Sequence, residues 1–159
     1  MLKEKKSKFY GYAFYISKTE EVTKYLTKLK KKHHSAGHFC YAYQIGIEDK
    51  SYRFNDDGEP RNSAGAPIYG QIKAFGLTNI LIVVVRYFGG TKLGVGGLIS
   101  AYKECAKKTL ENNTELSFYT GMFDFSDEGA KSKLFGIRSA AGIGSMIVSI
   151  LGLSLNTRL

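Results

Sequence analysis

The stretch from Ile80 to Leu98 reads ILIVVVRYFGGTKLGVGGL, an apolar run followed by a glycine-rich segment. Residues 80–85 are apolar and rich in β-branched side chains, which is typical of a strand covered on both faces. Five glycines then fall within the nine positions 89–97, here called the glycine segment. Such a density predicts a backbone that turns sharply or is approached closely. The sequence therefore predicts a strand at 80–87, a glycine loop and a helix at about 96–112.

A strand, a glycine loop and a helix in this order can build an anion site, because the loop and the helix N-terminus present unpaired N–H groups. The glycine segment fits neither common phosphate motif, however. Lys92 does not directly follow the second glycine of a GxxxxGK[ST] pattern, and Ile99 occupies the third glycine position of GxGxxG. Two interpretations of Arg86 stay open. It holds a phosphate together with Lys92, or it pairs with an acidic residue of the same domain.

The residues before this stretch contain further elements of both kinds. Residues 9–16 and 38–47 are predicted strands, and residues 51–54 are predicted to form a hairpin with the second of them. Ser17 and Glu20 have the spacing of a capping box, which predicts that a helix follows.

A second helix is predicted to begin at Pro67 and to end before Gly76, since proline favours the first helical position and glycine the position after the end. The order of elements over residues 1–113 is then β-α-β-β-α-β-α. This order predicts an α+β fold with two layers, in a domain that spans residues 1–115.

The pattern becomes irregular after this domain. Residues 116–125 are a possible strand, and residues 139–155 are an uncharged run rich in Gly, Ser, Ile and Leu. That run is shorter than the roughly 20 residues that a membrane span requires, so we predict no membrane association. Residues 116–159 are interpreted as a divergent or truncated remnant.

Positive charge is concentrated near the start of the chain. Residues 1–40 hold ten lysines and three glutamates, a net +7 of the total +9. A basic face of this kind indicates a nucleic acid, a ribosome or an acidic lipid surface as partner. The alternative is a solvated, lysine-rich helix face without a partner.

The loop NDDGEPRNSAG at residues 55–65, here called the acidic loop, has three carboxylates close together. Asp56, Asp57 and Glu59 are suited to hold Mg²⁺ or to exchange a proton. The same residues are also good turn formers, and the sequence favours the turn. A carboxylate of this loop that pairs with Arg86 or Arg53 would lock the acidic loop to the glycine segment.

Histidine and cysteine side chains do not predict a metal site. His33, His34, His38 and Cys40 are close in sequence, and His34, His38 and Cys40 could supply three zinc ligands. A helix break predicted at Gly37 separates His34 from His38, however, and no fourth ligand is evident. We therefore predict no metal and no cofactor. Cys40 and Cys105 lie far apart in a chain that opens with a charged segment instead of a signal peptide, which indicates reduced thiols in the cytoplasm.

Three segments together resemble the Impact / YigZ family: HFCYAY, DDGEPRNSAGAPI and VVVRYFGGTKLGVGGLISAY. The resemblance covers about residues 3–113. It implies a two-layer α/β sandwich similar to the second domain of a small-subunit ribosomal protein. It also implies a role in translation, because the eukaryotic members regulate translation and the bacterial members are expected to bind RNA or ribosomes.

The family's signature also implies the site. The predicted binding residues are His38, Arg53, Asp56, Asp57, Glu59, Arg86, Tyr87, Phe88, Gly89, Gly90, Lys92, Gly94, Gly96 and Gly97. Asn55 and the pair Asn62-Ser63 are mild departures from the usual pattern that leave the turn chemistry intact. Residues 117–159 are too few for the second, ferredoxin-like domain of bacterial relatives, which puts any function of that domain in doubt.

Two functions are consistent with these features. The first is a translation-associated binding module whose partner is RNA, the ribosome or a translation-control protein. The second is a small enzyme that acts on a phosphorylated substrate between the acidic loop and the glycine segment. The charge asymmetry favours the first, and no catalytic residue is assigned.

Overall fold

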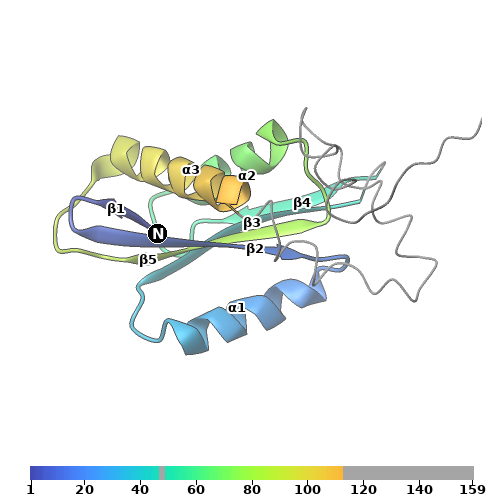
Figure 1. The fold of residues 1–159 in the computed structure, drawn as a ribbon, viewed down its shortest axis with the longest axis horizontal. Helices are drawn as coiled ribbons and strands as arrows, with labels where there is room; N and C mark the ends of the chain where they lie inside the picture. Colours follow the sequence, from blue (N-terminus) through green and yellow to red (C-terminus); the bar gives the residue numbers. More distant parts are fainter. Residues whose placement is uncertain (47–48, 113–159) are drawn as a thin grey trace, which may run out of the picture.

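The computed structural model describes residues 1–46 and 49–112 (Figure 1). The chain forms β1 (Leu2–Glu4), β2 (Ser7–Tyr15), α1 (Glu20–Lys32), β3 (His38–Ile45), β4 (Ser51–Asn55), α2 (Gly65–Ala74), β5 (Ile80–Tyr87) and α3 (Gly94–Asn112). The α+β class and the predicted order of elements are confirmed. The short strand β1, which the sequence had not indicated, precedes them.

The five strands form one antiparallel sheet in the order β1-β2-β5-β3-β4, so β5 is the central strand. Its residues 80–85 are all buried, as expected for a strand that is covered on both faces. Ile80, Ile82 and Val84 pack into one apolar cluster. Leu81, Val83 and Val85 pack into a second cluster on the opposite face. The alternation of side chains along β5 therefore supplies both cores.

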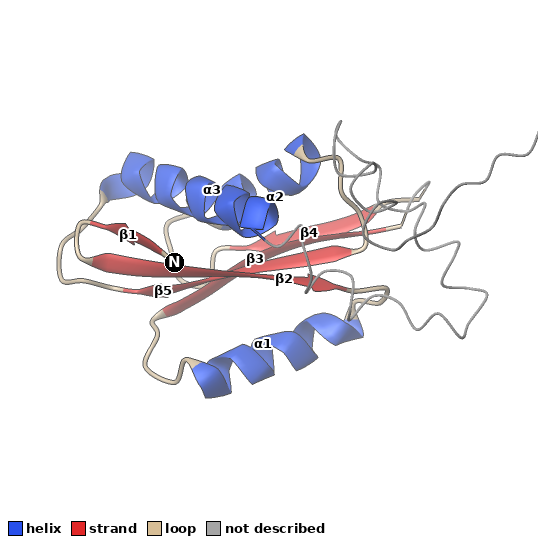
Figure 2. Cartoon of the chain, viewed as in Figure 1, coloured by secondary structure: helices blue, strands red, loops and turns tan. Residues whose placement is uncertain are grey.

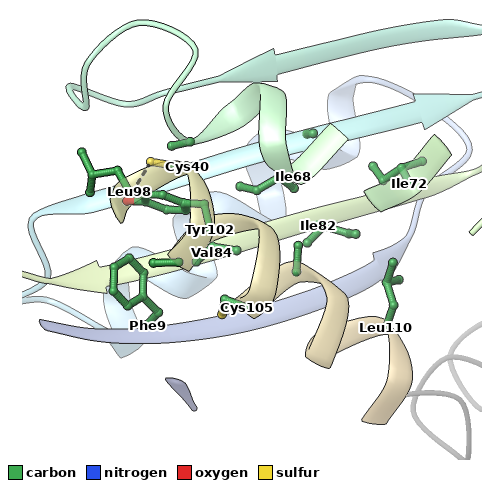
Figure 3. Packing of buried hydrophobic residues seen from close by; sticks show 14 of the residues in the cluster. Phe9, Cys40, Ile68, Ile72, Ile82, Val84, Leu98, Tyr102, Cys105 and Leu110 are labelled. Atoms are coloured by element: carbon green, nitrogen blue, oxygen red, sulfur yellow. Dashed lines mark hydrogen bonds between the residues drawn. The ribbon is translucent and has the colours of Figure 1, made fainter. Parts of the chain in front are cut away.

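Helices cover both faces of the sheet (Figures 1 and 2). Helices α2 and α3 lie over one face, and α1 lies over the other through Val22 and Leu29. The sequence predicted two layers, whereas α1 forms a third layer on the opposite face of the sheet. The core between the sheet and α3 is centred on Tyr102, which is fully buried and meets Phe9 edge to face at 5.2 Å (Figure 3).

Several boundaries differ from those expected. Helix α1 is capped by Glu21 instead of Glu20, because its Oε2 accepts the backbone N–H groups of Ser17 (2.7 Å) and Lys18 (2.9 Å). Helices α2 and α3 each start two residues earlier than predicted. Strand β3 ends at Ile45, where Gly46 takes a φ of 91°.

The possible strand at 116–125 and the uncharged run at 139–155 lie outside the described residues. Within the described part of the chain, no helix has both the length and the apolar character needed to cross a bilayer.

Candidate binding surface

Asp56 organises the acidic loop through its carboxylate. Its Oδ1 accepts the N–H groups of Ala64 (3.0 Å) and Gly65 (2.8 Å), and its Oδ2 accepts that of Asn62 (2.8 Å). These contacts cap the start of α2, where a negative charge also meets the positive end of the helix dipole. The early start of α2 follows, because the cap comes from Asp56 and not from the residue before Pro67. Both carboxylate oxygens are used by backbone donors, as in the turn interpretation.

Asp57 fastens the acidic loop to β3. Its Oδ2 accepts the backbone N–H of Phe39 at 2.7 Å, and its carbonyl accepts a hydrogen bond from His38 Nδ1 at 2.8 Å. Asn55 Oδ1 accepts the N–H of Asp57 in turn. The carboxylates of Asp56 and Asp57 therefore hold the loop in shape.

Glu59 and Arg86 form a buried ion pair that joins the acidic loop to the end of β5. Glu59 Oε1 lies 2.6 Å from an Arg86 guanidinium nitrogen, and the two side chains are only 4% and 5% exposed. The same oxygen accepts a hydrogen bond from Tyr102 Oη at 2.7 Å. Of the two interpretations of Arg86, the structure shows the internal pairing.

The other contacts of Arg86 tie it to the glycine segment. It donates to Ser7 Oγ at 3.2 Å, and this oxygen also accepts the N–H of Gly89. The guanidinium carbon lies 5.5 Å from the ring centres of both Phe9 and Phe88, a cation–π distance. Arg86 is therefore held on several sides, and its role is to position the loops.

Cys40 is a core thiol in this network. Its Sγ lies 3.0 Å from the carbonyl of Asp56 and 3.3 Å from Tyr102 Oη, the contact drawn in Figure 3. Burial raises the pKa of Cys40 far above its ordinary value, and burial likewise raises the pKa of Tyr102. A thiol that stays protonated is a poor nucleophile. The network therefore has a structural role.

The glycine segment spans the loop after β5 and the first turn of α3. A Cβ at Gly89 would lie 2.1 Å from the carbonyl carbon of Lys6, so the loop packs directly on the backbone of the β1–β2 hairpin. Gly90 and Gly94 have φ values of 82° and 77°, which favour glycine. Gly96 and Gly97 lie in the first turn of α3.

A cavity of about 380 Å³ opens between the acidic loop and the glycine segment. Its lining residues are His38, Gly58, Glu59, Pro60, Arg86, Phe88, Lys92, Leu93, Gly94, Val95 and Leu98. The cavity brings together six of the predicted binding residues. Because Glu59 neutralises Arg86, an anion in this cavity would meet the exposed Lys92 as its cation, a weaker site than the predicted pair.

Residues 5–110 match the Impact N-terminal domain. The chain belongs to this family. It is 42% identical over 107 residues to the Impact family member YvyE of Bacillus subtilis, covering 67% of this chain and 49% of that protein. It is 36% identical over 123 residues to YigZ of Escherichia coli, covering 73% and 60%. The chain therefore spans about half the length of the curated relatives it matches.

A solved relative supports the same fold. The crystal structure of a hypothetical protein is 34% identical, with a TM-score of 0.66, and the match covers 69% of this chain and 54% of that chain. The mixed α/β fold of this Impact-family domain is thus shared with a related protein.

Eight of the predicted binding residues do not line the cavity, and two of these, Arg53 and Tyr87, project to the opposite side of the sheet. Arg53 pairs in register with Tyr43 and so projects from the α1 side of the sheet. Tyr87 projects to the same side, where its hydroxyl is 2.8 Å from His33 Nδ1. A strand places successive side chains on opposite faces, so Tyr87 separates from its neighbour Arg86.

The sequence did not indicate three residues that support these contacts. Ser7 joins Arg86 to Gly89, and Tyr102 joins α3 to Glu59. His33 is buried between the hydroxyls of Tyr12 and Tyr87. The helical spacing of α3 places Tyr102 on its apolar side, but it does not reveal which partner the hydroxyl group reaches.

The lysines of α1 differ in their contacts from those of α3. Lys24, Lys28 and Lys31 are exposed, and among the described residues none of them lies within ion-pair distance of a carboxylate. On α3, by contrast, Lys107 pairs with Glu111 and Lys108 pairs with Glu104. The exposed lysines of α1 therefore carry positive charge that no described carboxylate offsets, whereas two of the lysines of α3 are paired.

Over residues 1–46 and 49–112, no three His, Cys, Asp or Glu side chains converge as a metal site would require.

Proposed function

We propose that this chain is a translation-associated binding protein of the cytoplasm that contacts RNA or a ribosomal surface through α1. The observation that carries the proposal is the ridge formed by Lys24, Lys28 and Lys31, exposed and without ion-pair partners among the described residues. Spacings of three and four residues place these ammonium groups on one side of the helix. Membership of the Impact family, whose eukaryotic members regulate translation, supports the same role.

The physics of phosphate binding makes the proposal measurable. Each lysine that neutralises a phosphate releases a counterion, so affinity falls as salt rises. The slope of log K against log salt is about −0.7 for each contact on a single strand. Loss of three contacts should therefore make the slope less steep by about two.

The experiment is sedimentation of the purified protein with ribosomes across a salt series. The variant Lys24→Ala/Lys28→Ala/Lys31→Ala should lose most binding at low salt and show a shallower salt dependence. The control Lys103→Ala/Lys107→Ala/Lys108→Ala removes the same formal charge from α3 and should bind nearly as the unchanged protein does. The proposal fails if the unchanged protein does not sediment with ribosomes or bind RNA at low salt, or if both variants lose binding equally.

A translation-control protein is a second candidate partner, at the cavity instead of at α1. The observation that favours it is the exposure of Phe88 and Val95, which are 54% and 53% accessible beside the cavity. Phe88→Ala should weaken binding to such a partner and leave ribosome sedimentation unchanged. Equal loss in both assays would argue against a separate protein site.

The enzyme alternative receives less support. This alternative assigns the phosphate to Arg86 and Lys92, and the metal or the base to Asp56, Asp57 or Glu59. Arg86 is paired with Glu59, and the carboxylates of Asp56 and Asp57 accept backbone N–H groups. A substrate would have to displace these contacts, so the geometry favours the binding module.

A further inference from the structure

Two tyrosines form a flat stack at the edge of the sheet, away from the cavity. The rings of Tyr52 on β4 and Tyr69 on α2 have centroids 4.6 Å apart and planes within 8° of each other. Phe54 continues the stack beside Tyr69 at 6.1 Å. The Lys73 ammonium lies 5.2 Å from the Tyr69 ring centre. These residues belong neither to the cavity lining nor to the α1 ridge.

Hydrogen bonds fix the orientation of the Tyr69 ring. Tyr69 Oη donates a hydrogen bond to Gln44 Oε1 at 3.0 Å, and the amide of the buried Gln44 donates to the carbonyl of Leu77 at 2.9 Å. Tyr52 rests on this fixed ring and is still 56% exposed. The stack therefore offers an aromatic surface that is already in place before a ligand arrives.

The shape of this surface indicates a planar ligand. The Tyr52 ring is flat and mostly exposed, and nucleobases stack on rings of this kind. The base has to be unpaired, because neighbouring base pairs cover both faces of a base inside a duplex.

Positive charge flanks the stack on both sides of β4. Arg53 follows Tyr52 in the strand, is exposed, and projects to the α1 side. Lys73 lies on the α2 side. A nucleic-acid strand that crosses the edge of the sheet would meet an aromatic ring and a cation on consecutive residues. Phosphate contacts of this kind position the strand while stacking holds the base.

We propose that Tyr52 stacks on an unpaired base of single-stranded RNA, with Arg53 and Lys73 contacting the adjacent phosphates. This inference rests on the proposed function, since it names the form of RNA and a second contact surface beside the α1 ridge. It also gives Arg53 a place at an RNA-binding surface, although this residue lies away from the cavity.

The test is fluorescence anisotropy with a labelled, unstructured RNA strand of about 12 nucleotides and with the same strand annealed to its complement. Tyr52→Ala should weaken binding of the single strand about tenfold, because the base loses the aromatic ring on which it stacks. Tyr52→Phe keeps the ring and should bind within about twofold of the unchanged protein. Neither change removes a charge, so the salt slope should stay the same. Thermal melting of each variant checks that it is folded.

The outcomes separate the inference from the function on which it rests. If the unchanged protein binds neither RNA, the proposed function fails and this inference fails with it. If it binds the single strand and Tyr52→Ala binds equally well, only the stacking site is wrong. The stacking site is also wrong if Tyr52→Ala weakens the duplex as much as the single strand.

Discussion

Glu59→Gln tests whether the buried ion pair holds the acidic loop against the end of β5. The change preserves the size of the side chain and one acceptor oxygen, but it removes the negative charge beside Arg86. Two hydrogen bonds meet Glu59 Oε1, from Arg86 at 2.6 Å and from Tyr102 at 2.7 Å. The Arg86 side chain is 5% exposed, so little water replaces the lost charge.

The expected loss follows from this burial. Removing one partner of a buried ion pair costs about 3–5 kcal/mol, because the other charge remains uncompensated. Glutamine still accepts hydrogen bonds, so we expect the lower end, about 3 kcal/mol of unfolding free energy. With a urea dependence of about 1–3 kcal/mol per molar, the unfolding midpoint should fall by about 1–3 M.

A double-mutant cycle measures the interaction itself. Arg86→Met should be destabilising alone, but Glu59→Gln/Arg86→Met should cost no more than either single change, because no buried charge is left unpaired. The matched control is Glu104→Gln, which removes the same charge from an exposed pair with Lys108 and should cost less than about 0.5 kcal/mol. Additive losses at Glu59 and Arg86, or a loss at Glu59 as small as at Glu104, would refute the reasoning.

Three further changes test other parts of the fold by urea or thermal unfolding. Asp56→Ala should cost about 2–3 kcal/mol, because three backbone N–H groups lose their acceptor; a cost below about 0.5 kcal/mol would contradict the capping role. Gly89→Ala should cost about 2–3 kcal/mol through its clash with the hairpin backbone, whereas Gly96→Ala, with open space around it, should be neutral or stabilising; equal effects would contradict the close approach. Burial, and then the neighbouring Lys32, lower the pKa of His33 below 6.5 in the folded protein. As pH falls, the unfolded chain therefore takes up a proton on this histidine at a higher pH than the folded protein does. Stability should therefore fall as pH drops below about 6.5, and His33→Asn should reduce that fall while the exposed His34→Asn does not; identical profiles would exclude His33.

Much of the fold could be predicted from local patterns. The apolar run of β5, the capping-box spacing before α1 and the proline near the start of α2 are signals between neighbours in the chain, and each predicted an element that the structure contains. Helix ends were less accurate, because α2 is capped by Asp56, eight residues before Ala64, and not by an adjacent side chain. The strand β1 was missed because three residues hold too little pattern.

The site was only partly predictable, for a related reason. The family signature selects residues along the chain without regard to the side on which each one projects. Arg86 and Tyr87 are consecutive, yet the first pairs with Glu59 and the second contacts His33 on the opposite face of the sheet. Arg53 separates from the acidic loop through the same alternation.

The sequence by itself determined the class of fold, the buried central strand, the concentration of lysine near the N-terminus and the family to which the chain belongs. These features depend on composition, periodicity and motif, which are properties of neighbouring residues. Only the tertiary structure decided which acid neutralises Arg86 and which side of the sheet α1 covers. It also decided that Tyr52 and Tyr69, which belong to different elements, form one stack. Such contacts join residues far apart in the chain, and they exist only after packing has brought the elements together.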